Sequence, residues 1–259
     1  MYIDTHTHVY PPYFQEGEVK KAVDNAKKAD TNIIINNGIN KSTNRAVLEL
    51  SKKFPELKAA FGIYPFEALQ KNIKIDDYVF KPDKFDIDEE IEFINKNKDQ
   101  IIAIGEIGLD FTIDETKPQL KVFEDLLELA QKINKPVSIH SRKAEQETIE
   151  ILESLKQKKV IMHCFSGKKK FYKRIADNGW YFSVPTNVVH SKQFQTLVQE
   201  VNLSNLFCET DAPYLGPFKD KKNEPAFVVE AYKKIAEIKK MELKEVENII
   251  FNNYQRLFL

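Results

Sequence analysis

Short apolar runs alternate with longer amphipathic segments along the whole chain, and this alternation most limits the folds open to it. Apolar runs of this length, bounded by polar turns, are typical of strands buried on both faces of a parallel sheet. We predict eight of them, at residues 2–8, 32–36, 57–62, 101–105, 136–140, 159–163, 180–184 and 206–209. Helical spacing occurs between and after them, at residues 18–29, 42–54, 87–97, 116–133, 144–157, 168–178, 192–201, 226–239 and 243–259.

Eight strands alternating with helices, with no break in composition, favour one α/β domain spanning residues 1–259. The count of eight favours a closed (β/α)8 TIM-type barrel over an open doubly wound sheet, and barrels of this length are common. Residues 66–86 lack a clean period but contain Tyr78, Phe80 and Phe85. This segment is either a flap over the functional site or a surface insertion that packs its own aromatics.

Composition excludes several classes of protein. Lys plus Arg and Asp plus Glu both number 39, so bulk charge does not suit the chain to coat nucleic acid or membrane, although a local cationic cleft remains open. No apolar run is long enough to span a membrane, and the N-terminus does not resemble a secretory signal. We expect Cys164 and Cys208 to be free thiols in a reducing, cytoplasmic setting.

The first strand contains two histidines that are two residues apart, His6 and His8. Successive side chains of a strand point to opposite faces, so these two imidazoles fall on the same side. A pair of neutral imidazoles forms half of a transition-metal site. Taken alone, such a pair also arises by chance in surface or core histidines.

Further acids and imidazoles fall where other predicted strands end. These residues are Glu106, His140, His163 and Asp211. In a (β/α)8 barrel the carboxyl ends of the strands share one rim, which is where the chemistry is placed. Each residue alone has a structural explanation, such as a core histidine, a helix-capping acid or a turn former. Their joint placement predicts a metal site, and it leaves His190 as a surface residue.

The types of ligand narrow the choice of ion. Imidazole and carboxylate suit zinc, manganese, cobalt or magnesium and do not suggest an iron–sulfur cluster. Cys164 follows His163 directly, so its thiol faces away from the site if that segment is extended. Six candidate ligands are more than one tetrahedral zinc uses, which favours two divalent ions bridged by Glu106.

Several sequence blocks, in order along nearly the whole chain, resemble the TatD family of metal-dependent deoxyribonucleases in the amidohydrolase-like superfamily. The blocks are DTHTH (4–8), IGEIGLDF (104–111), PVSIHSR (136–142), HCFSG (163–167), ETDAPYL (209–215) and NEP (223–225). The resemblance implies a (β/α)8 barrel that hydrolyses phosphodiester bonds in DNA with one or two divalent ions. It implies one ion held by His6, His8, Glu106 and Asp211, and another held by Glu106, His140 and His163.

The chain departs from the family after the third predicted strand, where many members have Gly-x-His-Pro-His and this chain has Tyr64 and Phe66. If the first histidine of the family binds the scissile phosphate, Tyr64 can donate a hydrogen bond but cannot carry positive charge. Lys222 also stands where an arginine is common, so a point charge replaces a planar fork. These changes bear on substrate choice more than on metal binding.

We therefore predict a 3′–5′ exonuclease in which Glu106 and Asp211 are catalytic and Asp211 helps to deprotonate the attacking water. Arg142 and Tyr64 are the predicted substrate contacts, and DNA is the predicted partner. No membrane or obligate protein partner is indicated. One alternative is an amidohydrolase-type enzyme acting on a small cyclic amide, lactone or phosphotriester. Another is a noncatalytic binding barrel, which would not need a poised acid such as Asp211.

Overall fold

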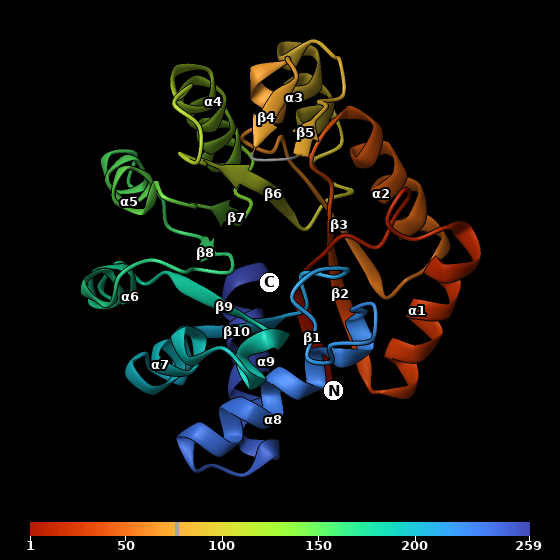
Figure 1. Ribbon diagram of the computed structural model, residues 1–259, viewed down its shortest axis with the longest axis vertical. Helices are drawn as coiled ribbons and strands as arrows, with labels where there is room; N and C mark the ends of the chain where they lie inside the picture. The colour runs from red at the N-terminus through yellow and green to blue at the C-terminus, as the bar shows by residue number, and fades with distance from the viewer. Residues whose placement is uncertain (76–77) are drawn as a thin grey trace.

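The computed structural model describes residues 1–75 and 78–259. Within these residues an eight-stranded sheet has the order β1-β2-β3-β6-β7-β8-β9-β10, and each ladder in it is parallel. Figure 1 looks into the ring that the strands form, with helices around it. The strands are β1 (Tyr2–Thr7), β2 (Thr31–Asn37), β3 (Leu57–Phe61), β6 (Ala103–Gly108), β7 (Val137–His140), β8 (Val160–Met162), β9 (Tyr181–Pro185) and β10 (Leu206–Glu209). This arrangement confirms the predicted single-domain (β/α)8 barrel.

The ring nearly closes where the first and last strands meet. The Asp211 amide donates to the carbonyl oxygen of His6 at 2.9 Å, and the Thr5 hydroxyl donates to the carbonyl oxygen of Cys208 at 3.0 Å. These bonds join the segment after β10 to β1. They bring the first and last strands of the barrel side by side, so that the residues after β10 lie next to His6 of β1.

The helices surround the strands and pack on them through several buried apolar clusters. Leu126 and Phe123 of one such helix are buried in the same cluster as Ile107 and Ile139 of the strands. The helices are α1 (Glu16–Lys28), α2 (Lys41–Lys53), α3 (Ile87–Lys96), α4 (Lys117–Lys132), α5 (Glu145–Ser154), α6 (Tyr172–Asp177), α7 (Lys192–Glu200), α8 (Val228–Lys239) and α9 (Leu243–Phe258). Short 3-10 turns η1 (Glu67–Leu69), η2 (Lys169–Phe171), η3 (Thr186–Val189), η4 (Leu203–Asn205) and η5 (Pro225–Phe227) complete the connections. The burial stabilises the barrel because it removes apolar surface from water.

The segment between β3 and α3 contains η1 and a small antiparallel hairpin, β4 (Ile73–Ile75) with β5 (Tyr78–Phe80). Phe66 and Leu69 are buried in a cluster against which Tyr64 and Phe80 pack. The segment thus packs its own aromatics, as one of the two interpretations predicts, while Phe85 joins the main core. Residues 76 and 77 of the predicted flap, and the side chain of Tyr78, lie outside the described residues.

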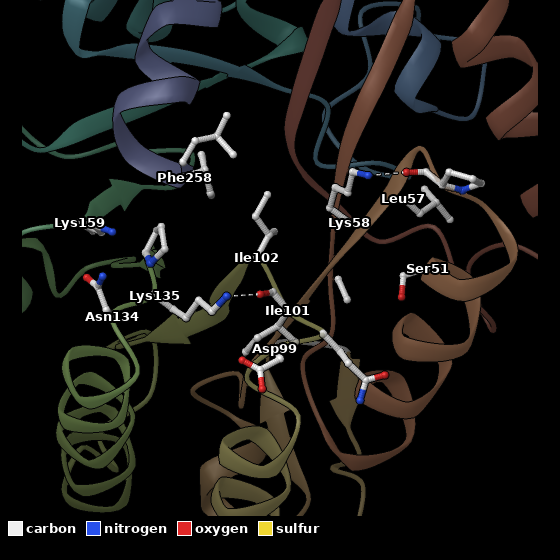
Figure 2. Close-up of a pocket in the computed structure, with 15 residues that line it drawn as sticks. Ser51, Leu57, Lys58, Asp99, Ile101, Ile102, Asn134, Lys135, Lys159 and Phe258 are labelled. Atoms are coloured by element: carbon white, nitrogen blue, oxygen red, sulfur yellow. Dashed lines mark hydrogen bonds between the residues drawn. The ribbon is translucent and has the colours of Figure 1, made fainter.

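A cavity of about 460 Å³ lies at the amino ends of β3, β6, β7 and β8, on the opposite side of the barrel from the predicted ligands (Figure 2). Lysines 58, 135 and 159 line it. The Lys135 amine donates to the carbonyl oxygen of Ile101 at 2.7 Å, and the Lys58 amine donates to that of Pro55 at 2.6 Å. Two of the three lysines therefore donate hydrogen bonds to backbone carbonyl oxygens.

Candidate metal centre

All six predicted ligands come together at the carboxyl rim. Glu106 lies inside β6, because this strand continues three residues past its predicted end at residue 105 and stops at Gly108. His140 is the last residue of β7. His163 follows β8 directly, and Asp211 lies two residues after the end of β10. The predicted end of the fourth apolar run at residue 105 was therefore too early. The longer strand places the Glu106 carboxylate in the middle of the ring.

Glu106 directs its two carboxylate oxygens toward two different groups of imidazoles. Its Oε2 lies 3.5 Å from the Nε2 atoms of both His6 and His8. Its Oε1 lies 3.0 Å from His140 Nδ1 and 3.9 Å from His163 Nε2. The side-chain atoms of His6, His8 and Glu106 lie within 4.8 Å of one another, as do those of Glu106, His140 and His163. A carboxylate with this arrangement can bridge two cations.

Asp211 approaches the same point from the segment after β10. Its Oδ1 lies 3.6 Å from His8 Nε2 and 4.0 Å from the Nε2 atoms of both His6 and His163. The backbone of Asp211 is in the left-handed region, with φ of 55°, and its amide is bonded to β1. Such a conformation is uncommon for aspartate and is typical of functional positions.

The other ring nitrogens of His6 and His8 are held by hydrogen bonds. His8 Nδ1 lies 2.9 Å from the carbonyl oxygen of Asn37 and 2.8 Å from the Tyr10 hydroxyl. Because a carbonyl can only accept, His8 Nδ1 carries a hydrogen, and this leaves Nε2 directed toward Glu106 and Asp211. His6 Nδ1 lies 3.0 Å from the Ser138 hydroxyl. Partners of this kind fix the orientation of metal-binding histidines.

Two carboxylates hold the remaining histidines in the same way. His163 Nδ1 donates to Glu209 Oε2 at 2.8 Å, and His140 Nε2 donates to Asp110 Oδ2 at 2.9 Å. Glu209 is buried and also accepts from the Cys164 amide at 3.0 Å. These orienting roles were not predicted, although both acids stand within the blocks at the strand ends. The sequence did offer one signal for this role: Glu209 lies two residues before Asp211, and Asp110 lies four residues after Glu106.

Charges within the cluster reinforce this arrangement. Burial raises the pKa of Glu106, but hydrogen bonds from His140 and the other facing imidazoles hold it well below its usual value. Burial likewise lowers the pKa of His8, but Asp211 and Glu106 outweigh this and raise it to about 10. Glu106 and Asp211 are therefore ionised, and His8 carries a second proton, on Nε2, at neutral pH when no cation is present. Cation binding must displace that proton.

Two glycines permit the close packing around Glu106. A Cβ on Gly62 would lie 2.3 Å from the carbonyl oxygen of Glu106, and one on Gly108 would lie 1.9 Å from that of His140. Gly108 also has φ of 142°, a conformation that side chains disfavour. Both positions therefore require glycine for the ligand-bearing strands to meet as they do.

The two predicted substrate contacts lie at different depths. The Tyr64 hydroxyl donates to Asp110 Oδ2 at 3.4 Å, and its ring lies edge-on to His140 at 5.0 Å. Burial and the charges of Glu106 and Asp110 raise the pKa of Tyr64 well above its usual value, so the hydroxyl keeps its proton. Arg142, two residues after β7, is exposed, and its charge opposes this rise in the pKa of Tyr64.

Among the described residues, the groups of side chains that could hold a metal ion contain neither His190 nor a cysteine. His190 is exposed, and its Nε2 donates to the carbonyl oxygen of Pro217 at 2.6 Å. Cys164 and Cys208 are free cysteines. We expected the Cys164 thiol to face away from the site if the segment after β8 is extended. That segment is not extended, because φ of Cys164 is 44°. The described residues form no helix that is both long and apolar enough to cross a membrane.

A parallel barrel with histidines and acids clustered at its carboxyl rim defines a metal-dependent hydrolase of the barrel type. The model of the family described as TatD related DNase matches residues 3–259. The chain therefore belongs to this family. Membership confirms the prediction of a metal-dependent hydrolase of the deoxyribonuclease type, which acts on ester bonds.

Individual relatives agree with this assignment. A metal-dependent hydrolase of Methanocaldococcus jannaschii is 34% identical over 257 residues, covering 99% of this chain and 96% of its own. The deoxyribonuclease TATDN3 of Homo sapiens is 29% identical over 267 residues, covering 99% and 94%. The crystal structure of YjjV, a TatD homolog from Escherichia coli K12, superposes with a TM-score of 0.85 at 24% identity and covers 99% and 97%.

Proposed function

We propose that the protein is a DNase that binds two divalent cations and removes nucleotides from the 3′ end of a DNA strand. The observation that carries the proposal is the division of the Glu106 carboxylate between two groups of imidazoles. His6, His8, Glu106 and Asp211 would hold one cation, and Glu106, His140 and His163 would hold the other. The nitrogen and oxygen donors suit magnesium, manganese, zinc or cobalt.

Divalent ions bound at such a site lower the pKa of coordinated water toward ~7 and neutralise charge on phosphoryl oxygens. Asp211 supplies the general base in this proposal, because Oδ1 is ionised and faces the centre of the cluster. It would accept the proton of the water that attacks phosphorus in line. The Glu106 carboxylate would remain ionised throughout and hold the His6–His8 group and the His140–His163 group at a fixed separation.

Arg142 and Tyr64 would position the phosphodiester. The exposed guanidinium of Arg142 can give a charged pair of donors to a nonbridging oxygen. The Tyr64 hydroxyl stands beside His140 and can add a neutral donor in place of the family's histidine. A cytoplasmic location, expected from the sequence, remains part of this proposal.

The test uses purified protein with EDTA, Mg²⁺, Mn²⁺, Zn²⁺ or Co²⁺ on single- and double-stranded DNA labelled at either end. We expect a 5′-labelled strand to shorten progressively and a 3′ label to be released as mononucleotide, only with a divalent ion. Internal cuts would replace the exonuclease mode by an endonuclease mode. No DNA cleavage, with turnover of a small amide, lactone or phosphotriester, would support the amidohydrolase alternative instead.

Cation stoichiometry provides a readout that does not depend on activity. Equilibrium dialysis should find two cations per chain in the wild type. His140→Ala removes a ligand from only one of the two proposed groups and should reduce the number to one. Two cations retained in His140→Ala would overturn the proposed division of ligands.

A further inference from the structure

The surface beside the metal centre has exposed aromatic side chains. Large apolar side chains exposed among the described residues are Val79, Tyr214, Phe218 and Leu259. Tyr214, which is 49% exposed, and Phe218, which is 41% exposed, both lie in the segment that follows Asp211. Exposed aromatics next to a site often mark a surface that binds a ligand.

Ring contacts lead from a predicted ligand out to Tyr214. The ring of His8 lies 5.7 Å from that of Tyr10 and 6.3 Å from that of Tyr13. The Tyr13 ring in turn lies 5.7 Å from the Tyr214 ring, edge to face at 74°. Tyr10 is fully buried and Tyr13 is partly buried, so Tyr214 is the outermost ring of the series. We name Tyr10, Tyr13 and Tyr214 the tyrosine series.

The backbone that carries Tyr214 is fixed relative to the site. The Tyr214 amide donates to the carbonyl oxygen of Asp211 at 2.8 Å. The buried Asn223 side chain donates from Nδ2 to the carbonyl oxygen of Tyr214 at 2.5 Å and to that of Thr210 at 2.8 Å. Lys222 ties the same segment to the connection between β1 and α1 through the Tyr13 carbonyl oxygen, and Figure 1 shows these two connections beside each other. The segment that carries the exposed ring is thus held close to Asp211, the proposed general base.

We propose that Tyr214, backed by Tyr13, stacks on the nucleobase of the nucleotide next to the scissile bond. This inference rests on the proposed nuclease function and assigns a side chain that holds one base of the substrate beside the site. Lys219 and Lys221 lie in the same segment, with Asp220 between them, and can pair with backbone phosphates. Stacking of bases on aromatics tolerates any sequence, so the contact does not select for a particular base.

The experiment compares two substrates with two matched variants. One substrate is a single-stranded oligonucleotide, and the other is identical but lacks the bases of its last two nucleotides at the attacked end. Tyr214→Ala should lower kcat/KM by about 5- to 150-fold on the first, the range for loss of one base–aromatic stack, and leave the second unchanged. Tyr214→Trp should retain activity on both. Phe218→Ala is the matched control, since it removes an exposed ring that packs on Phe227, outside the tyrosine series.

Each outcome bears on a different claim. Equal losses for Tyr214→Ala on both substrates, with its melting temperature unchanged, would overturn the stacking role. A loss for Phe218→Ala as large as that for Tyr214→Ala would also overturn it. If the wild type cleaved neither substrate with any of the cations, the proposed function itself would fail, and this result is distinct from the other two.

Discussion

The two ends of the barrel are both lined by polar side chains, but they use them differently. At the amino end, Lys58 and Lys135 each donate to a backbone carbonyl beside the cavity in Figure 2. At the carboxyl end, imidazoles and carboxylates face one another, with Glu106 and Asp211 at the centre. Polar residues at the amino end therefore stabilise the chain, whereas those at the carboxyl end form a reactive cluster.

The largest expected effect is at Asp211. Asp211→Asn keeps the size of the side chain but removes its charge and its capacity to accept a proton. We expect kcat to fall by about 10²- to 10⁴-fold, the usual contribution of a general base. Steady-state cleavage of labelled DNA measures this change. His190→Ala is the control, because His190 is exposed and lies outside the candidate metal groups of the described residues, and it should not alter kcat.

A smaller effect is expected from the acids that orient the histidines. Glu209→Gln and Asp110→Asn each leave the ligand in place but weaken the hold on His163 or His140. Loss of such a partner typically costs about 10- to 100-fold in metal affinity or activity. Metal titration followed by DNA cleavage at saturating cation separates the two effects. Unchanged affinity and activity in both variants would show that these acids are structural only.

The convergence of the six predicted ligands could be predicted from the sequence because the carboxyl ends of parallel strands share one rim. His6 and His8 followed from the two-residue period of a strand, and Glu106 and His140 from their places at the ends of apolar runs. The division of labour among acids was not predictable in this way. Glu209 and Asp211 are two residues apart, and only the left-handed backbone at Asp211 turns its carboxylate to the centre while Glu209 holds His163.

The small hairpin after β3 was harder to predict for a related reason. Its strands are three residues long, so they are too short to show a period. Contacts between distant residues, such as that of Tyr64 with Phe80, determine how the segment packs. The sequence indicated aromatic packing there but could not indicate where the aromatics would meet.

Glu67 is a buried acid at the carboxyl end whose carboxylate contacts no imidazole among the described residues. It is 2% exposed, and its carboxylate accepts from the Asn40 side chain and from the Asp83 amide, both at 2.8 Å. Burial outweighs these bonds and raises its pKa to about 7. The folded chain therefore keeps a proton that the unfolded chain releases above about 4.5.

The sign of the resulting pH dependence follows from this difference. The folded state holds more protons than the unfolded state between the two pKa values, so this contribution to stability is present at low pH and lost as pH rises through about 7. The free energy of unfolding of the wild type, relative to Glu67→Gln, should fall by about 2 kcal/mol between pH 5 and pH 8. Urea unfolding of both proteins measures it. Parallel pH profiles would contradict the assignment to Glu67.

The smallest effect is expected at the amino end, where Lys135 can be replaced without touching the site. Lys135→Met keeps most of the apolar stem but removes the hydrogen bond to the Ile101 carbonyl oxygen. The free energy of unfolding should fall by about 1 kcal/mol, the usual value for one hydrogen bond, and kcat/KM on DNA should stay unchanged. Urea unfolding and the cleavage assay measure the two quantities on one preparation. A loss of activity as large as that of Asp110→Asn, without a loss of stability, would mean that the amino end takes part in the reaction and that the two ends are not divided as their contacts indicate.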